Sequence, residues 1–441
     1  MTIHKFTIKE TDTVFYYDNT FDGLLDKDMK PLSKERLEPD HYVDWVHARN
    51  ADKDKVIRKV NNPVMIKILL GHRCNMACGY CLQDELSSKH DGDVRTKEKA
   101  KALTLKEKIS SYLDLSRLER MELWGGEAFL YWHEVSALMT EFDRPGLNWY
   151  IPTNGSLIDE RHVEFFKTLQ GNVCIGISHD GPAHTVTRGI DPLPKMVETI
   201  RAMQDAHPKI QFSFNPVISN QNYDLFALND FFKNYLRSNN LKNVPLMFEI
   251  IQVYNLQEIR GTSRSYALMG EDLKKYKQIL KDYLKAHEIQ ATTLPRDQIA
   301  HGEYLITNLY ELYPGAMTFA REMDRFSVMH TGAKCQADQE AQLSIDMDGN
   351  VRTCQNVGKE FSFGNISDIE KVGVTNLDTN QGPHCSSCRV RFLCKSQCPI
   401  KQHEEVFDTN CKINKVHYSG IQDAAFSYLF RKDVEWNGVK P

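Results

Sequence analysis

The sequence predicts an α/β protein built around a parallel sheet. Between residues 63 and about 255, short apolar runs alternate with amphipathic stretches of helical period. The runs are VMIKILL (64–70), MELW (121–124), WYIP (149–152), VCIGIS (173–178), FSFNPVI (212–218) and LMFEIIQV (246–253). Nearly continuous apolar strands between helices are typical of right-handed βαβ units. The pattern fits an open sheet and a closed barrel equally well.

The composition is that of an ordinary folded protein. The chain has 441 residues, of which 41% are hydrophobic and 26% charged, and this length favours roughly two to three domains. A formal charge of −4 gives no support to nucleic-acid binding as the main task. No run approaches the roughly 18 apolar residues of a membrane span, and the amino terminus lacks a signal-peptide pattern. We therefore expect a cytoplasmic protein without a membrane partner.

The segments that follow the first four runs carry the candidate chemistry. They are a three-cysteine loop (74–81), GGEA (125–128), TNGS (153–156) and HDGP (179–182). The carboxyl ends of parallel strands meet at one edge of a sheet or barrel, where such folds place their sites. We therefore expect these loops to share one rim.

The eleven cysteines fall into two groups and one isolated residue. Cys74, Cys78 and Cys81 form the first group, and seven more lie in 335–411. Clustered cysteines in a reducing compartment hold metal more often than they form disulfides. Three thiolates leave one iron of a cubane cluster open. The structural alternatives are a zinc knuckle and a cluster whose fourth ligand comes from elsewhere in the chain. Cys174 stands alone in an apolar run, where we expect it to be a small buried hydrophobe.

The spacing Cys74-x3-Cys78-x2-Cys81, with Tyr80 before the last cysteine, resembles the signature loop of the radical S-adenosylmethionine (radical SAM) superfamily. The resemblance implies a partial (β/α)6 TIM-like barrel of parallel strands. It also implies a 4Fe-4S cluster on the three cysteines, which thereby become catalytic, with the open iron chelated by SAM.

A second match lies at the end of the second predicted strand. Gly125, Gly126 and Glu127 resemble the GGE motif, which in that family holds the amino group of SAM. Glycine lets the backbone approach a ligand closely, and a carboxylate complements an ammonium group. The proline that usually follows the motif is replaced by Ala128.

The other rim loops match the family more loosely. Thr153 and Asn154 resemble a TNG turn, while Ser178 and Asp180 resemble the SxDGP segment that approaches the SAM ribose in peptide-modifying members. Asn215, on the fifth predicted strand, is a candidate for a further ribose or carboxylate contact.

The carboxyl-terminal cysteines resemble the SPASM extension of radical SAM enzymes, for which a pair of zinc ribbons is the structural alternative. The resemblance implies two auxiliary 4Fe-4S clusters, the first on Cys335, Cys354 and Cys398 and the second on Cys385, Cys388, Cys394 and Cys411. The family's further cysteine after Cys335 is missing. The first auxiliary cluster therefore has an open iron or takes another ligand, such as Asp338.

The position after Cys354 bears on the reaction. Sulfatase-maturing members carry an aspartate there as a candidate base, whereas this chain has Gln355, which disfavours that activity. Asp346, Asp348 and Glu249 remain as candidate catalytic bases. His179 is either a neighbour of SAM or substrate, or a histidine with its hydrogen bonds satisfied by the protein.

Auxiliary clusters suit a net oxidation, so we expect an oxidoreductase that crosslinks side chains of a ribosomally made peptide, with a flavodoxin- or ferredoxin-like reductant. The alternatives are radical SAM modification of a small molecule or carbohydrate, and a noncatalytic iron–sulfur or zinc protein. The predicted organisation is an amino-terminal cap or partner-binding segment (1–62), the partial barrel (63–255), a helical connection (256–334), a cysteine-rich SPASM domain (335–411) and a helical tail (412–441).

Overall fold

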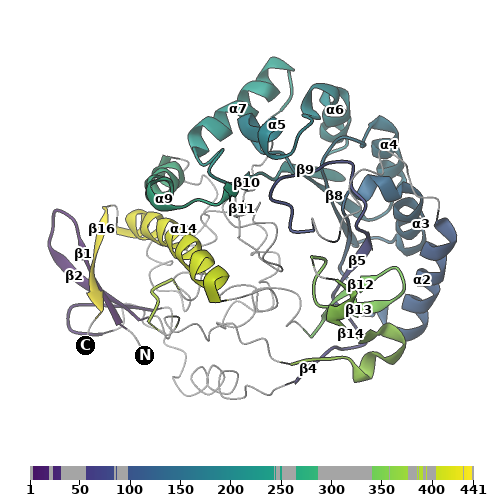
Figure 1. Ribbon diagram of the computed structural model, residues 1–441, viewed down its shortest axis with the longest axis horizontal. Coiled ribbons are helices and arrows are strands. Elements are labelled where there is room, and N and C mark those ends of the chain that lie inside the picture. The colour runs from purple at the N-terminus through teal and green to yellow at the C-terminus, as the bar shows by residue number, and fades with distance from the viewer. Residues whose placement is uncertain are drawn as a thin grey trace.

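Figure 1 shows the computed structural model of the protein. It describes residues 3–18, 23–30, 56–83, 86, 98–242, 244, 249–250, 265–286, 340–356, 358–375, 385, 387–390, 394, 404–430 and 432–439.

A mostly parallel sheet forms the centre of the fold. Within the described residues it has eight strands in the order β14-β13-β12-β5-β6-β7-β8-β9. Their bounds are β5 Met65–Gly71, β6 Arg120–Gly125, β7 Asn148–Thr153, β8 Asn172–Ile177, β9 Ile210–Phe214, β12 Gln342–Asp346, β13 Asn350–Arg352 and β14 Ser362–Asn365. All pairs from β12 to β9 are parallel. The predicted α/β class and its parallel sheet are confirmed.

The fifth predicted strand is divided. β9 ends at Phe214, and β10 (Val217–Ile218) pairs in parallel with β11 (Glu249–Ile250) instead of continuing the large sheet. Pro216 lies between β9 and β10, and proline has no N–H to donate to a strand ladder. The rest of the sixth predicted run, 246–253, lies outside the described residues.

Helices cover one face of the sheet. They are α2 (Lys99–Tyr112), α3 (Trp132–Phe142), α4 (Glu160–Thr168), α6 (Val197–Asp205) and α7 (Leu225–Ser238), which line its outer side in Figure 1. The strand side chains on this face are apolar and at most 1% exposed: Ile66, Ile68, Met121, Leu123, Trp149, Ile151, Val173 and Ile175. The core therefore lies between this face and the helices.

The opposite face of the sheet is polar. Strand register aligns one row of residues across it: Ser344, Lys67, Glu122, Tyr150, Cys174 and Gln211. Cys174 is half-buried there, whereas a small buried hydrophobe was expected. Side chains alternate along a strand, so the helix-facing Val173 and Ile175 turn Cys174 to the polar face.

A hairpin that turns at Gly349 extends the same sheet. β12 and β13 pair antiparallel, and Gly349 N donates to Asp346 O at 3.0 Å to close the turn. Gly349 has φ +83°, a conformation that favours glycine. Because β12 also pairs with β5, this part of the predicted 335–411 domain continues the central sheet.

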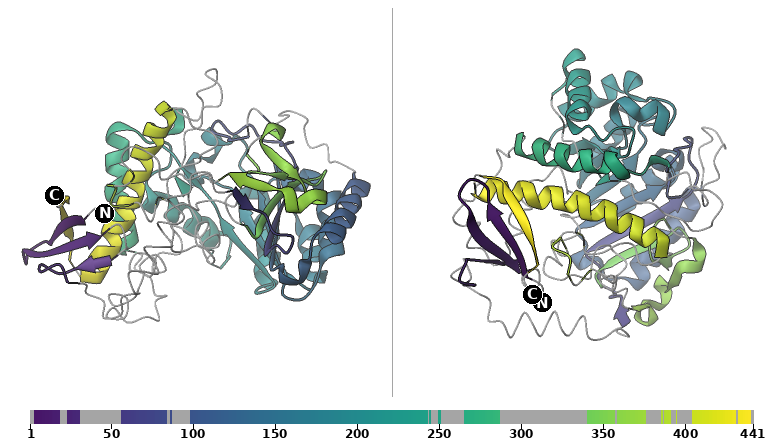
Figure 2. Two further views of the ribbon diagram at one scale, coloured as in Figure 1. Left: turned by 90° about the horizontal axis from the view of Figure 1, so that it is seen from below. Right: turned by 60° about the vertical axis from the view of Figure 1, so that its left-hand side comes forward.

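A second, antiparallel sheet joins the two ends of the chain. Its order is β16-β1-β2-β3, with β1 Ile3–Ile8, β2 Thr13–Asp18, β3 Gly23–Leu25 and β16 Val434–Val439. β1 and β16 lie side by side in Figure 2. The tail predicted to be helical over 412–441 is helical only as far as Phe430. After Phe430 the chain forms the strand β16, which brings Trp436 onto Phe6 of β1, with ring centroids 5.0 Å apart.

Long helices connect this sheet to the barrel. α14 (Glu404–Phe430) packs along α9 (Gly270–Ala286), which lies in the predicted helical connection. Tyr276 Oη on α9 and His417 Nδ1 on α14 are 2.8 Å apart. The short helix α5 (His184–Thr187) follows β8, and β4 (Val56–Arg58) pairs with β15 (Gly373–Thr375). Within the described part of the chain, no helix has both the length and the apolarity to cross a membrane.

Candidate active site

The turn after β6 is joined to the start of the cysteine loop through the backbone. Gly126 N donates to Gly71 O at 3.0 Å, and Glu127 N donates to Arg73 O at 2.9 Å. A Cβ on Gly126 would lie 2.4 Å from Arg73 O. Only glycine permits this approach, so the GGE sequence fixes the chain immediately before Cys74.

Tyr131 holds the same segment from the other side. Arg73 N donates to Tyr131 Oη at 2.8 Å, and a Cβ on Gly71 would lie 2.3 Å from that oxygen. Burial raises the pKa of Tyr131 to about 12, so its hydroxyl stays protonated. Sequence reasoning missed Tyr131; the signal was its position four residues after Glu127, in the buried turn AFLY.

The three cysteines of the loop lie near one another and are half-buried. Burial, together with the nearby Glu127 carboxylate and the thiols of Cys78 and Cys81, raises the pKa of Cys74 to about 12. Such a thiol ionises at neutral pH only when a cation accompanies it. Met76 N donates to Cys74 Sγ at 3.5 Å. Among the described residues, no three His, Cys, Asp or Glu side chains gather closely enough to hold a single metal ion.

Glu127 connects the turns after β6 and β7. Its Oε1 accepts from Phe129 N at 3.0 Å and from Thr153 Oγ1 at 2.7 Å, and its Oε2 accepts from Asn154 N at 2.7 Å. The side chain is 1% exposed, and this burial raises its pKa despite the three donors. A carboxylate has about four lone-pair sites, so Oε2 can accept one more donor.

Asn154 links its own turn to the cysteine loop. Asn154 Nδ2 donates to Asn75 Oδ1 at 2.9 Å, and Asn75 Nδ2 donates to Ser156 Oγ at 2.9 Å. Gly155, with φ +80°, makes the turn possible. The cysteine loop, the GGE turn and the TNG turn therefore form one hydrogen-bonded unit, as their predicted place on a common rim requires.

Asp180 lies beneath the cysteine loop and is fully buried. Its Oδ2 accepts from the hydroxyl of Tyr80, from Thr187 Oγ1 at 2.7 Å and from Arg188 Nε at 2.9 Å, while its Oδ1 accepts from Val217 N at 3.0 Å. All these donors come from the chain itself. The geometry therefore makes Asp180 an anchor for Tyr80, a role that the sequence did not indicate.

Tyr80 and its neighbour Gly79 fix the back of the loop. Gly79 N donates to Thr187 O at 2.9 Å, and a Cβ on Gly79 would lie 2.5 Å from the ring of Tyr266. Tyr266 also meets the buried ring of Tyr80 edge to face, with centroids 5.8 Å apart. The loop is thus held against α5 through its backbone and against Tyr266 through the ring of Tyr80.

Ser178 and Asn215 follow β8 and β9 at the same rim. Ser178 N donates to Thr153 O at 2.8 Å. Asn215 Oδ1 accepts from Ser213 Oγ at 2.7 Å, and its Nδ2 donates to Tyr150 Oη at 3.3 Å on the polar face of the sheet. Both residues directly follow the carboxyl ends of parallel strands.

His179 has its hydrogen bonds satisfied by the protein. Its Nδ1 accepts from Gly181 N at 3.0 Å, so in the neutral ring Nε2 carries the proton and donates to Asp191 Oδ1 at 2.9 Å. The side chain is fully buried and stacks on His184 at 3.9 Å. Of the two expectations for His179, this geometry supports the structural one.

A buried ion pair on the polar face was not predicted. Lys67 Nζ lies 3.2 Å from Glu122 Oε2 and 4.3 Å from the centre of the Trp124 ring. Trp124 Nε1 donates to Glu122 Oε2 at 2.7 Å, and Arg120 Nε forms an ion pair with Glu122 Oε1 at 2.9 Å. Burial opposes ionisation, but Lys67 and Arg120 hold the pKa of Glu122 below its usual value. The available signal was a charged residue inside each of two adjacent apolar runs.

The second cysteine region reaches the cysteine loop through Gln83. Gln83 Nε2 donates to Gln355 O at 3.1 Å and to Asn356 Oδ1 at 3.2 Å. Asn356 N donates to Cys354 Sγ at 3.4 Å, and Lys67 Nζ donates to Gln355 Oε1 at 3.4 Å. Gln355 is therefore brought next to the polar face of the sheet.

Two of the candidate catalytic bases, Asp346 and Asp348, lie at the turn of the β12–β13 hairpin. Asp346 Oδ1 accepts from Asp348 N and Asn350 N, both at 3.0 Å, so it closes the hairpin turn. Asp348 is 51% exposed and pairs with Lys101 of the outer helix α2 at 3.1 Å. The structure thus places Asp348 on the exposed side of the hairpin turn, and its catalytic role stays a prediction. The side chain of Glu249, in β11, lies outside what the structure describes.

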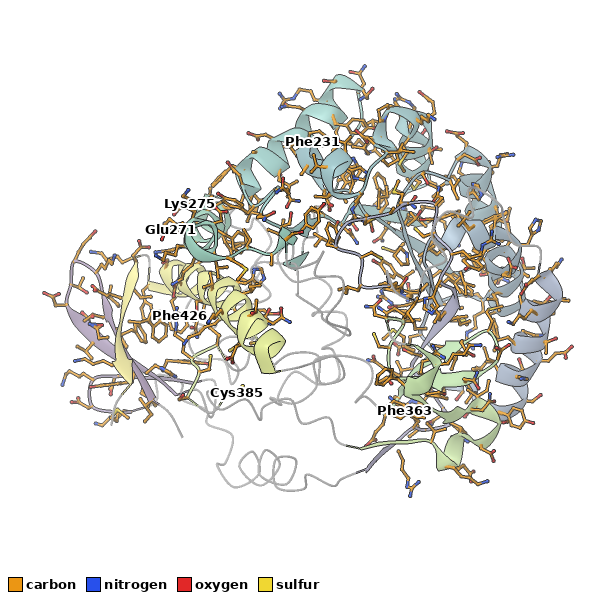
Figure 3. The ribbon with its side chains drawn as sticks, viewed as in Figure 1. Phe231, Glu271, Lys275, Phe363, Cys385 and Phe426 are labelled. Carbon is orange, nitrogen blue, oxygen red and sulfur yellow. The ribbon has the colours of Figure 1, made fainter. Side chains whose placement is uncertain are left out.

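Part of the second auxiliary set comes together. Burial, followed by the proximity of Cys385 and Cys388, raises the pKa of Cys411 on α14. Cys388 N donates to Cys385 O at 3.1 Å, and Cys394 N donates to Val390 O at 2.8 Å. Figure 3 shows Cys385 below α14. Cys335 and Cys398, predicted for the first auxiliary cluster, lie outside the described residues, as does Asp338.

Asp423 fastens this cysteine segment to α14. Its carboxylate accepts from Arg389 at 2.8 Å, from Trp436 Nε1 at 2.8 Å and from Lys277 at 2.9 Å. The guanidinium of Arg389 also lies 4.2 Å from the centre of the Trp436 ring.

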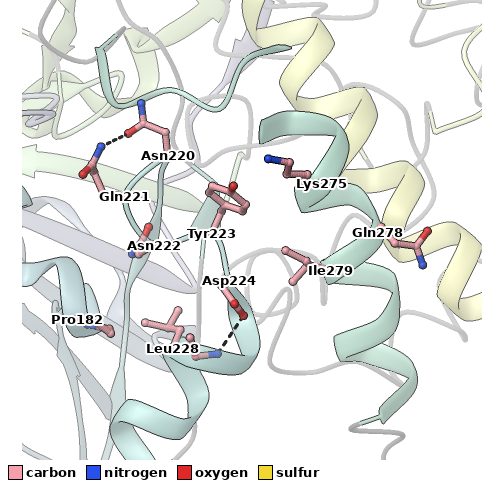
Figure 4. Close-up of a pocket in the computed structure, with 11 residues that line it drawn as sticks. Pro182, Asn220, Gln221, Asn222, Tyr223, Asp224, Leu228, Lys275, Gln278 and Ile279 are labelled. Carbon is pink, nitrogen blue, oxygen red and sulfur yellow. Dashed lines mark hydrogen bonds between the residues drawn. The ribbon is translucent and has the colours of Figure 1, made fainter. Parts of the chain in front are cut away.

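A cavity of about 520 Å³ lies between α7, α9 and the segment 219–224 (Figure 4). Pro182 of the HDGP segment forms part of its wall, and Tyr223 and Lys275 line it. None of the candidate catalytic or ligand residues lines this cavity.

Residues 68–227 match the sequence model of the radical SAM superfamily. The radical SAM cyclopropyl synthase TigE of Paramaledivibacter caminithermalis is 22% identical over 355 residues, which cover 76% of this chain and 67% of that protein. An S-adenosylmethionine-dependent nucleotide dehydratase of Psychrobacter lutiphocae is 25% identical over 179 residues, 37% of this chain and 58% of that protein.

Solved structures share the fold. A histidine-tagged form of anSMEcpe with bound AdoMet has a TM-score of 0.55 at 18% identity, covering 84% of this chain and 95% of that one. Native anSMEcpe with bound AdoMet and the Cp18Cys peptide also gives 0.55, at 17% identity, over 83% of this chain and 98% of that one. At these identities the similarity establishes the fold alone.

Proposed function

We propose, from the radical SAM domain that residues 68–227 form, that this protein is a radical SAM enzyme which oxidatively crosslinks side chains of a ribosomally made peptide. The observation that carries the proposal is the hydrogen-bonded unit of the cysteine loop with the GGE and TNG turns. It places three thiols beside a buried carboxylate at the carboxyl ends of parallel strands.

The donor set fits a 4Fe-4S cluster. Cys74, Cys78 and Cys81 are three soft ligands on one short loop, and the donation from Met76 N to Cys74 Sγ is of the kind that tunes cluster sulfurs. In our proposal Glu127 receives the amino group of SAM on Oε2, while its three protein donors hold the carboxylate in place. When bound, the cluster supplies the electron that cleaves SAM to methionine and a 5′-deoxyadenosyl radical, the agent of hydrogen abstraction.

In our proposal the remaining rim residues surround SAM or support the cysteine loop. We assign Thr153, Asn154, Ser178 and Asn215 to the surroundings of SAM, and Tyr80 with Asp180 to the support of the loop. The polar face of the sheet, with Lys67 and Glu122, then faces the substrate. Charged groups held in a water-poor site keep a fixed geometry during the reaction.

Three observations support a peptide substrate and a net oxidation. The relative TigE is named a cyclopropyl synthase, and the structure of anSMEcpe, which has a similar fold, contains the bound Cp18Cys peptide. In addition, Cys411 lies close to Cys385 and Cys388, as the ligands of an auxiliary cluster would. We propose a SPASM-type second cysteine region on this basis. Gln355, whose amide cannot act as a base, keeps sulfatase-type maturation a disfavoured alternative.

The test is cluster content and SAM cleavage in anaerobically reconstituted protein. We expect about twelve irons per chain for the wild type and about eight for a Cys74, Cys78 and Cys81 triple alanine variant, which also loses 5′-deoxyadenosine formation with dithionite. Cys174→Ala is the matched control, because this half-buried cysteine lies outside both cysteine groups, and it should retain all iron.

Either of two results would overturn the proposal: zinc in place of iron, or full clusters that never cleave SAM. A wild type that cleaves SAM but leaves every candidate peptide unchanged, while modifying a small molecule or carbohydrate, would replace the peptide substrate alone.

A further inference from the structure

Arg188 is a buried cation directly behind the cysteine loop. Its side chain is 9% exposed, and its Nε lies 2.9 Å from Asp180 Oδ2. The guanidinium carbon is 5.4 Å from the centre of the Tyr80 ring, which precedes Cys81. A buried charge in such a position has a large influence on its neighbours, because the protein interior screens it weakly.

The chain around Arg188 is fixed against the loop. Thr187 O accepts from Gly79 N at 2.9 Å, and Thr187 Oγ1 donates to Asp180 Oδ2 at 2.7 Å. Burial disfavours the charged guanidinium, yet Asp180, Tyr80 and Cys78 hold the pKa of Arg188 well above its usual value. Cys78 is thus close enough to interact electrostatically with Arg188.

Asp180 is less negative toward its surroundings than its formal charge suggests. Four donors share its two oxygens, including Val217 N at 3.0 Å and the hydroxyl of Tyr80. The neighbouring His184 is neutral, since burial lowers its pKa to about 4. Arg188 therefore remains the fixed positive group behind the thiol of Cys78.

The net charge around an iron–sulfur cluster sets its reduction potential, and a nearby cation favours the more negative, reduced state. We propose that Arg188 is a positioning residue that raises the reduction potential of the cluster held by the cysteine loop, with Asp180 fixing its place. The inference rests on the proposed function, because it requires the barrel cluster.

The test is the midpoint potential of the barrel cluster, measured by an EPR-monitored redox titration of reconstituted protein. We expect Arg188→Met to lower the equilibrium constant for reduction at least tenfold, a fall of about 59 mV for one electron, and Arg188→Lys to keep most of the wild-type potential. Arg161→Met removes an 81% exposed arginine and should leave the potential unchanged.

Asp180→Asn distinguishes an electrostatic effect of Arg188 on the cluster from a purely structural role of the Arg188–Asp180 pair. The variant removes the negative charge of Asp180 and keeps the positive charge of Arg188. Our inference requires the midpoint potential of the barrel cluster in Asp180→Asn to equal or exceed that of the wild type. If Arg188→Met does not retain iron, the potential of Asp180→Asn alone tests the inference. A fall in Asp180→Asn, or an unchanged potential in an iron-replete Arg188→Met, overturns the inference. A wild type that binds no cluster refutes the proposed function instead.

Discussion

Replacing Lys67 by methionine should destabilise the protein by about 3 kcal/mol at pH 7. Removing one partner of a buried ion pair leaves the other charge uncompensated, which costs about 3 to 5 kcal/mol. Glu122 would lose the ammonium group at 3.2 Å but keep Arg120 at 2.9 Å and Trp124 Nε1 at 2.7 Å. The lower end of the range therefore applies.

The double variant Lys67→Met with Glu122→Gln is the decisive comparison. It removes both charges of the pair and leaves Arg120, whose side chain is 22% exposed to solvent. Glutamine can still accept from Trp124, so the double variant should lie within about 1 kcal/mol of the wild type. The assay is urea unfolding followed by circular dichroism and by tryptophan fluorescence, with coincident transitions as the criterion for a single free energy.

The pH dependence gives a second readout of the same pair. The pKa of Glu122 is depressed in the folded state, so its stabilisation is complete above the ordinary value of 4.5 and is lost as pH falls through the folded value. The cost of Lys67→Met should therefore shrink below pH 4.5. A single variant within about 0.5 kcal/mol of the wild type at pH 7, or a double variant no better than the single one, would refute the reasoning.

Three further changes test other parts of the site. Gly126→Ala places a Cβ 2.4 Å from Arg73 O, so the cysteine loop must move, and bound iron per chain should fall after reconstitution. Tyr131→Phe leaves Arg73 N without its acceptor and should cost about 1 to 3 kcal/mol in urea unfolding. Asp423→Asn should lower stability at neutral pH and progressively less in acid, because Arg389 and Lys277 depress the carboxylate pKa despite its burial, and that contribution disappears as pH falls through the folded value.

The rim could be predicted because its signals are local. Each motif lies within a few residues of an apolar run, and the order of the runs along the chain is also their order in the sheet from β5 to β9. Parallel pairing then brings the cysteine loop, the GGE turn and the TNG turn to one edge without any further information.

The contacts that support the rim, such as those of Lys67 with Glu122 and of Asp180 with the cysteine loop, could not be predicted. They depend on strand register and on how distant segments pack together. Whether Lys67 meets Glu122 is decided by which residues of β5 and β6 lie opposite each other. The burial of Asp180 likewise follows from where α5 returns against the loop. The strand at Val434–Val439 was missed because its partner, β1, is at the other end of the chain, and no local period reports such a pairing.

The sheet that joins β1 to β16 has a consequence for biosynthesis. Chains are made from the amino terminus, so β1 leaves the ribosome long before β16 exists. Trp436, which meets Arg389 and Asp423, belongs to this late strand. The segment carrying Cys385 and Cys388 can therefore gain its contacts to Asp423 and Trp436 only after those distant residues have been made.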